Sequence, residues 1–355
     1  MQQVWINAKG ESATLGVREA PAPQPGPGEV RVAVAAAGVN FADVMMRRGL
    51  YPDAPPLPAV PGYEVAGEVV DVGPGVPDEL VGRPVVAMCR FGGYSEEICL
   101  PRALVWERPA AVDAVAAAAV PVNYLTAWQM VRVMAPATAG DTVLIHSAAG
   151  GVGQAVIQLA GEAGATLLGS ASPAKHALLR DQGLVHVFDS REPDFAAGVR
   201  AATGGRGVDI ALEPRNGRWI GASYDSLAKC GRLVLFGFSG AARGRRSGTW
   251  SAVRTLAGVP WLRLNPIRLM NDNKAIAGVN LGRMWDQQER TAAWMEALLT
   301  RLADGRIRPV IDRVLPFSRA AEAHDRLEER RNVGKVILVP DARFAGEAGR
   351  QGGAP

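Results

Sequence analysis

The stretch VLIHSAAGGVGQAVIQLA (Val143 to Ala160) constrains the fold more than any other part of the chain. A short apolar run leads into a glycine-rich loop, and a helical pattern of apolar residues begins within that loop. Glycines at this point let backbone amides approach a phosphate, and the helix N-terminus adds positive partial charge. The stretch therefore predicts a dinucleotide pyrophosphate site, although a structural tight turn is the alternative for a lone motif. The predicted contacts are Ala149, Gly150, Gly151, Val152 and Gly153.

The pattern around this stretch predicts two domains of an α/β protein. Short buried-strand candidates alternate with helical segments over residues 123–280, which predicts a doubly wound parallel sheet with helices on both faces, a Rossmann domain. Residues 1–122 instead carry β-type runs broken by Gly and Pro, typical of a compact, mostly β domain. Residues 281–341, with a second helix capped by Ser318, are expected to return to that domain, and 342–355 to form a disordered tail.

Composition excludes several classes of protein. The formal charge is only +4 over 355 residues, which does not predict nucleic-acid binding. Three cysteines without a CxxC pair argue against a disulfide framework or a structural zinc site, and favour a reducing compartment. The N-terminus lacks the pattern of a signal peptide, and the most apolar stretch, 110–122, is too short to span a bilayer. We therefore expect a cytoplasmic protein.

The end of the second strand predicts which dinucleotide is bound. NAD-binding domains usually carry an acidic residue about twenty positions after the glycine loop, and none occurs between Gly164 and Arg180. Ser170, Ser172 and Lys175 stand there instead, and Arg191 follows the third strand. A carboxylate would repel the 2′-phosphate of NADPH, whereas these hydroxyls and cations could bind it. We therefore expect NADPH. The alternative is that Lys175 is an ordinary exposed helix lysine.

Several motifs resemble those of one enzyme family in sequence order. They are GVNFADVMMRRGLYP, VPGYEVAGEVVDVG, NYLTAW, HSAAGGVGQAVIQLA, GRLVLFGFSG and AAEAHDRLEERRNVGKVIL. On these motifs the chain resembles the zinc-free quinone oxidoreductase (zeta-crystallin-like) branch of the medium-chain dehydrogenase/reductase superfamily. The resemblance implies a GroES-like substrate domain beside the Rossmann domain. The longer segment before NPIRLMNDNKAIAG resembles the vesicle amine transport protein subgroup.

The resemblance also shows what has replaced the catalytic zinc of the alcohol dehydrogenases. The matching positions hold Asn40, Tyr63 and Asn123, and amides and a phenol are poor zinc ligands. We therefore expect no metal. Hydride transfer without a Lewis acid suits acceptors that stabilise their own charge, which are quinones and α,β-unsaturated carbonyls. An enoyl reductase of a biosynthetic pathway and a non-enzymatic NADPH-binding protein remain as alternatives.

The family likewise implies residue roles. Asn40, Tyr51 and Thr126 would lie beside the nicotinamide, with Tyr51 as the main candidate proton donor and Tyr63 close to it. Each tyrosine is equally compatible with a role in shaping the pocket wall. The nicotinamide side would be completed by Phe236, Gly237, Asn280 and Leu281, and Lys335 would approach the phosphates unless it is a structural lysine.

Three further features leave alternatives open. Arg215, in LEPRNG, could meet a cofactor phosphate or an acidic substrate. The basic segment from Ala241 to Lys274, with two tryptophans, is typical of a subunit interface or pocket lid, and less so of a membrane surface. The strand from Ile276 to Val279 is expected to pair across a homodimer, because an open sheet edge must be covered.

Overall fold

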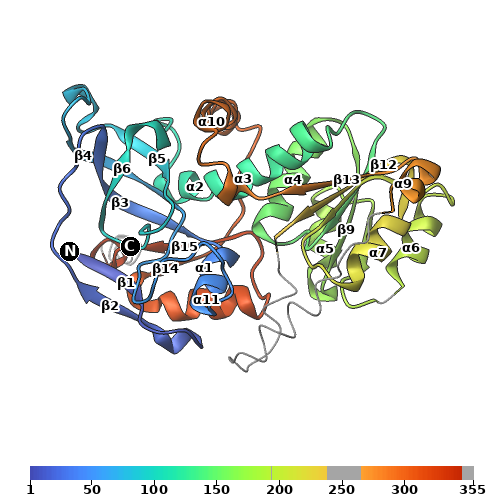
Figure 1. The fold of residues 1–355 in the computed structure, drawn as a ribbon, viewed down its shortest axis with the longest axis horizontal. Coiled ribbons are helices and arrows are strands. Elements are labelled where there is room, and N and C mark those ends of the chain that lie inside the picture. Colours follow the sequence, from blue (N-terminus) through green and yellow to red (C-terminus); the bar gives the residue numbers. More distant parts are fainter. Residues whose placement is uncertain (193, 238–264, 346–355) are drawn as a thin grey trace, which may run out of the picture. The chain divides into compact units, whose positions relative to one another are not determined.

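The computed structural model describes residues 1–192, 194–237 and 265–345, and the chain divides into two compact units (Figure 1). The first unit contains Met1–Leu125 and Met284–Pro355, and the second contains Thr126–Arg283. The protein is thus α/β, with a mostly β unit discontinuous in sequence and a parallel-sheet unit inserted into it.

The first unit is built on a seven-stranded sheet in which the order β14-β15-β3-β4-β5-β7 is completed by β6 alongside β3. Its strands are β3 (Glu29–Val39), β4 (Glu64–Val72), β5 (Pro84–Met88), β6 (Glu97–Pro101), β7 (Val105–Glu107), β14 (Ile311–Pro316) and β15 (Lys335–Val339). All neighbours are antiparallel except β14 and β15. The hairpin of β1 (Gln2–Ile6) and β2 (Leu15–Glu19) forms a separate sheet. Residues from the C-terminal part of the chain therefore lie directly beside β3.

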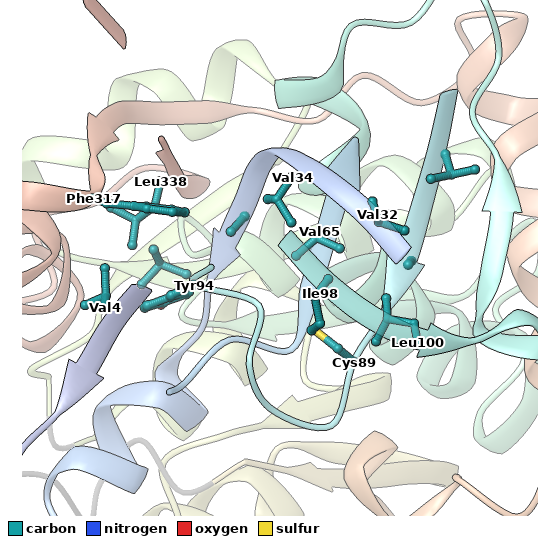
Figure 2. Close-up of a cluster of buried hydrophobic side chains, with 14 of the residues drawn as sticks. Val4, Val32, Val34, Val65, Cys89, Tyr94, Ile98, Leu100, Phe317 and Leu338 are labelled. Carbon is teal, nitrogen blue, oxygen red and sulfur yellow. The ribbon is translucent and has the colours of Figure 1, made fainter. Parts of the chain in front are cut away.

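Alternating apolar residues on these strands form the core of the first unit (Figure 2). Val32 and Val34 of β3 meet Val65 of β4, and Phe317 and Leu338 come from the C-terminal part of the chain. Each fully buried side chain of this size stabilises the fold by roughly 1.5–3 kcal/mol. The helices of this unit are α1 (Phe41–Arg47), α2 (Ala114–Ala118), α10 (Gln288–Ala303) and α11 (Ala320–Glu328), and α3 (Pro121–Trp128) runs into the second unit.

The second unit contains a six-stranded parallel sheet in the order β10-β9-β8-β11-β12-β13. The strands are β8 (Thr142–His146), β9 (Thr166–Ala171), β10 (His186–Asp189), β11 (Val208–Glu213), β12 (Leu227–Phe236) and β13 (Ala275–Val279). This is the doubly wound order of a Rossmann domain, as the sequence predicts. Because all strands are parallel, their carboxyl ends and the loops that follow them gather at one edge of the sheet.

Helices connect these strands and flank the sheet (Figure 1). They are α4 (Gly151–Glu162), α5 (His176–Asp181), α6 (Phe195–Ala202), α7 (Arg218–Asp225) and α9 (Pro266–Asp272), preceded by a π-helical turn at Gln129–Met134. The first of them, α4, contacts β8 and β9, and α7 contacts β11 and β12. In the described part of the chain, no helix has both the length and the apolar character needed to cross a bilayer.

One local expectation is wrong, and two others fall partly outside the described residues. Ser318 does not cap α11: its hydroxyl lies 3.1 Å from Asp341 Oδ1, and the helix begins at Ala320 after a 3-10 turn. Residues 342–345, at the start of the expected tail, belong to a helical turn that includes a hydrogen bond from the Phe344 amide to Pro340 O, and 346–355 lie outside the described residues. Of the basic segment, 241–264 also lies outside them, and the remainder forms α9 and its flanks.

Candidate active site

The glycine loop joins β8 to α4 through a backbone geometry that requires small residues. Gly150 occupies the N-cap position and α4 begins at Gly151. A Cβ on Gly153 would lie 2.5 Å from Ala148 O and 2.6 Å from Ser147 O, so only glycine lets the helix start this close to the strand. The first amides of a helix have no partner within the helix. The loop thus has the features of a dinucleotide pyrophosphate site.

The side chains expected around the adenosine ribose lie in different environments. Ser170 is buried, and its hydroxyl lies 2.8 Å from His146 Nδ1. Ser172 and Lys175 are partly exposed around a short 3-10 turn. Arg191 is exposed and forms a bidentate ion pair with Asp189, the last residue of β10, which holds the pKa of that carboxyl below its usual value. Ser172, Lys175 and Arg191 therefore remain ribose candidates, whereas the Ser170 hydroxyl faces the interior.

Arg215 belongs to a buried ionic network, which the sequence did not reveal. Its guanidinium pairs with Glu213 at 2.9 Å and lies 3.9 Å from the centre of the Trp219 ring. Its Nη2 also donates to His146 Nδ1 at 3.0 Å, so that nitrogen must be unprotonated. Burial, with help from Arg215, lowers the pKa of His146 to about 3. His146 is thus a neutral structural residue, and Arg215 is engaged inside the second unit.

The expected nicotinamide contacts of the second unit lie on two adjacent strand ends. Phe236 pairs in register with Val279, which brings Phe236 and Gly237 beside Asn280 and Leu281. The Gly237 carbonyl accepts a hydrogen bond from Asn216, which ties this edge to the loop after β11. Thr126 lies on α3 and is partly buried.

In the first unit, an aromatic cluster surrounds Tyr63. Its ring contacts Tyr51 edge-on at a centroid distance of 5.9 Å, and Phe91 at 5.4 Å. The Tyr63 hydroxyl is buried, and no group in the described residues meets it with hydrogen-bond geometry. Burial, followed by the nearby Asp43 carboxylate, raises the pKa of Tyr63. Tyr51 also contributes to this raised pKa, so Tyr63 is a protonated phenol with Tyr51 as a polar neighbour.

Asn40 follows β3 and is held by internal hydrogen bonds. Its Nδ2 donates to Glu64 Oε1 at 2.9 Å and to Gly38 O at 3.3 Å, and its Oδ1 accepts from Lys335 Nζ at 2.6 Å. Since an amide nitrogen has two hydrogens and its oxygen two lone pairs, Asn40 retains one acceptor position and no donor. Asn40 can therefore accept a hydrogen bond from a ligand but cannot give one in this arrangement.

Lys335 has partners that the sequence did not predict. It is 3% exposed at the start of β15 and forms an ion pair with Glu64, which is fully buried. These contacts favour a structural role for Lys335. Its expected contact with the cofactor phosphates stays a prediction. No sequence pattern joins Asn40, Glu64 and Lys335, because they come together only through the pairing of β3 with β4 and β15.

The three positions that hold zinc in alcohol dehydrogenases do not fit the metal here. The Asn40 amide is engaged, the pKa of the Tyr63 phenol is raised, and Asn123 is a buried amide. Within the described ranges, no three His, Cys, Asp or Glu residues gather as a metal site. Cys89 is buried with a raised pKa and donates to Gly62 O. The donor set is therefore unsuited to zinc.

Comparison with known proteins supports this assignment. The family model for the alcohol dehydrogenase GroES-like domain matches residues 26–110, and that for zinc-binding dehydrogenases matches 182–338. The human synaptic vesicle membrane protein VAT-1 homolog is 36% identical over 308 residues, 86% of this chain and 77% of that protein. The chain belongs to the medium-chain dehydrogenase/reductase superfamily. This superfamily comprises oxidoreductases, and the donor set described above is consistent with its zinc-free branch.

Solved structures of superfamily members agree over nearly the whole chain. A mycobacterial protein complexed with NADPH has a TM-score of 0.83 at 33% identity, covering 96% of this chain and 100% of its own. A mycobacterial quinone oxidoreductase reaches 0.79 at 32% identity, with 96% and 100% covered. The CurK enoyl reductase reaches 0.80 at 29% identity, with 96% and 99% covered. The fold is thus shared by proteins with different acceptors.

Proposed function

We propose that this protein is an NADPH-dependent, zinc-independent oxidoreductase that transfers hydride to a quinone or an α,β-unsaturated carbonyl. The observation that carries the proposal is Tyr63, a buried and protonated phenol at a position where the zinc-dependent relatives hold a metal ligand. A neutral donor of this kind can stabilise an acceptor oxygen that gains negative charge, but cannot polarise a carbonyl as a metal ion does. Acceptors already activated by conjugation fit such a site.

The residues of this chain would divide the work as follows. Amides of the loop from Gly150 to Gly153 bind the pyrophosphate, and Asn40 accepts one hydrogen bond through its remaining Oδ1 position. Tyr63 and Tyr51 hydrogen-bond the acceptor oxygen, and Tyr51, which is the more exposed, can exchange its proton with solvent. The bound dinucleotide supplies the hydride.

The preference for NADPH rests on Lys175 and Arg191. Both are cations near the carboxyl ends of β9 and β10, where the adenosine ribose lies in Rossmann domains. Asp189 also lies there, and an acid at this edge would favour a ribose without phosphate. Its charge, however, is paired with Arg191, and exposed pairs of this kind rearrange easily. The structural neighbour that was solved with NADPH supports the same choice.

A panel assay tests the proposal. NADPH consumption would be followed with several quinones and enones before and after treatment with a chelator. Turnover with at least one of these acceptors, unchanged by the chelator, supports the proposal. Tight NADPH binding without turnover of any acceptor would contradict it.

Two other functions are favoured by specific observations. The similarity to the CurK enoyl reductase favours an acyl-chain enone as acceptor, which the same assay would detect with an enoyl thioester. The similarity to a synaptic vesicle membrane protein favours a non-enzymatic, NADPH-binding role at a membrane. Co-sedimentation of the full chain with anionic vesicles, together with absence of turnover, would support that role.

Self-association would follow from the edge of the parallel sheet. In the described residues β13 is the last strand in the order, and it pairs with β12. Exposed Ile267 and Met270 lie on α9, just before it in sequence. A homodimer that pairs β13 with its copy would cover this edge. Light scattering that shows a monomer at micromolar concentration would contradict it. A cytoplasmic location remains a prediction.

A further inference from the structure

The Glu64 carboxylate joins separate segments of the first unit. Its Oε1 accepts a hydrogen bond from Asn40 Nδ2 at 2.9 Å, and its Oε2 accepts one from the Val122 amide at 2.7 Å. Glu64 itself directly follows Tyr63, and Val122 directly precedes Asn123. One buried carboxylate therefore connects the segments of all three residues that stand at the zinc-ligand positions.

We propose that Glu64 is a positioning residue that cross-links these three segments, with Lys335 as its counter-ion. The cross-link fixes Asn40 and Tyr63 relative to each other within the first unit. The inference rests on the proposed function for the roles of those side chains, but the cross-link itself is a property of the first unit alone.

Close packing around Glu64 supports a fixed position. A Cβ on Gly38 would lie 2.4 Å from Glu64 Oε1 and 2.7 Å from its Cγ and Cδ. Glycine at residue 38 of β3 therefore makes the space that the glutamate side chain fills. Both side chains of the Glu64–Lys335 pair are enclosed by protein, since Glu64 is fully buried and Lys335 is 3% exposed.

The charge state of Glu64 also follows from its partners. Asn40 Nδ2, the Val122 amide and Lys335 Nζ can only donate hydrogen bonds, so the carboxylate must accept all of them. A glutamine would place two donor hydrogens against at least one of these donors. Lys335 compensates the buried negative charge. Because the ammonium can only donate and the carboxylate only accepts, the Asn40 amide must turn its oxygen to Lys335 and its nitrogen to Glu64.

The first test compares Glu64→Gln with Glu68→Gln, an exposed glutamate on the same strand β4. Hydrogen exchange measured by mass spectrometry should become faster in peptides covering 38–47, 60–66 and 119–125 for Glu64→Gln only. If the proposed activity is present, kcat/KM for the acceptor should fall by about 100-fold, the effect of misplacing reacting groups by about 1 Å. NADPH affinity should fall far less. Equal exchange in the two variants at all three segments would overturn the inference, whether or not the protein turns over a substrate.

A second pair of variants separates positioning from simple charge burial. Lys335→Met leaves Glu64 as an unpaired buried charge and should lower the melting temperature strongly, whereas Glu64→Met/Lys335→Met removes both charges and should recover much of it. Under the positioning role, fast exchange in the three segments persists in the double variant. Recovery of slow exchange there would overturn the inference. Gly38→Ala, which displaces Glu64 and changes no charged group, should loosen the same segments.

Discussion

Replacing Gly153 by alanine should weaken dinucleotide binding through a steric effect whose size follows from the structure. The added Cβ would lie 2.5 Å from Ala148 O and 2.6 Å from Ser147 O, whereas ordinary contacts begin at 3.4 Å. The start of α4 must therefore move away from the end of β8 by close to an ångström. Overpacking of this kind costs about 1–3 kcal/mol, which corresponds to roughly a 5- to 150-fold loss if it is expressed in NADPH affinity.

Two other glycines provide matched controls for Gly153→Ala. A Cβ on Gly150 would lie 3.3 Å from Ser147 O, so Gly150→Ala should have a smaller effect. A Cβ on Gly221 of α7 meets nothing within 4 Å, and Gly221→Ala should stabilise the protein by about 0.4–1 kcal/mol. The assay is fluorescence titration of NADPH, with thermal unfolding measured in parallel. A Gly153→Ala variant that binds NADPH as tightly as the unaltered protein would refute the assignment of this loop.

Three further predictions concern charge and proton donation. Lys175→Ala and Arg191→Ala should each weaken NADPH binding by about five- to a hundredfold and leave NADH binding almost unchanged, since a charge-assisted contact is worth roughly 1–3 kcal/mol; equal weakening of both cofactors would contradict this ribose assignment. Tyr63→Phe and Tyr51→Phe should each lower kcat, by about 100-fold for the residue that protonates the acceptor, and a full rate in the double variant would show that solvent suffices. Burial raises the pKa of Asp43 to about 6, so the folded state holds this proton more tightly than the unfolded state. As the pH falls from 7 to 5, the free energy of unfolding of the unaltered protein should therefore rise by about 1 kcal/mol relative to that of Asp43→Asn. Urea unfolding measures both, and an equal pH dependence in the two proteins would contradict the prediction.

The fold was predictable because its signals are local. Alternating strand and helix patterns predict the parallel sheet, and the glycine loop predicts where its first crossover begins. The mostly β unit was likewise predicted from short strands separated by Gly and Pro, and residues 281–341 were expected from their own helix and strand pattern to return to it. Both sheets are present, and β15 of the C-terminal part lies beside β3.

The candidate site was predictable only in part, because side-chain partners depend on tertiary pairing. Lys335 and Asn40 are 295 residues apart and meet only because β15 lies beside β3. Arg215, in the loop after β11, contacts His146 at the end of β8, so nothing in the sequence indicates that Arg215 is buried. The ion pair of Arg191 with Asp189 could have been predicted, since an acid two residues before Arg191, at the end of a strand, is visible in the sequence. Ser170 faced inward because its strand position, and not its chemistry, decides its direction.

The most direct test of the central claim is transfer of deuterium to an enone from NADPH that carries deuterium at both nicotinamide C4 positions, measured by mass spectrometry in protein shown to contain no bound zinc. The account predicts that metal-free protein moves one deuterium to the β-carbon of the product, at a rate that chelators do not change. Product without the label, or activity that appears only when zinc is bound, would contradict it.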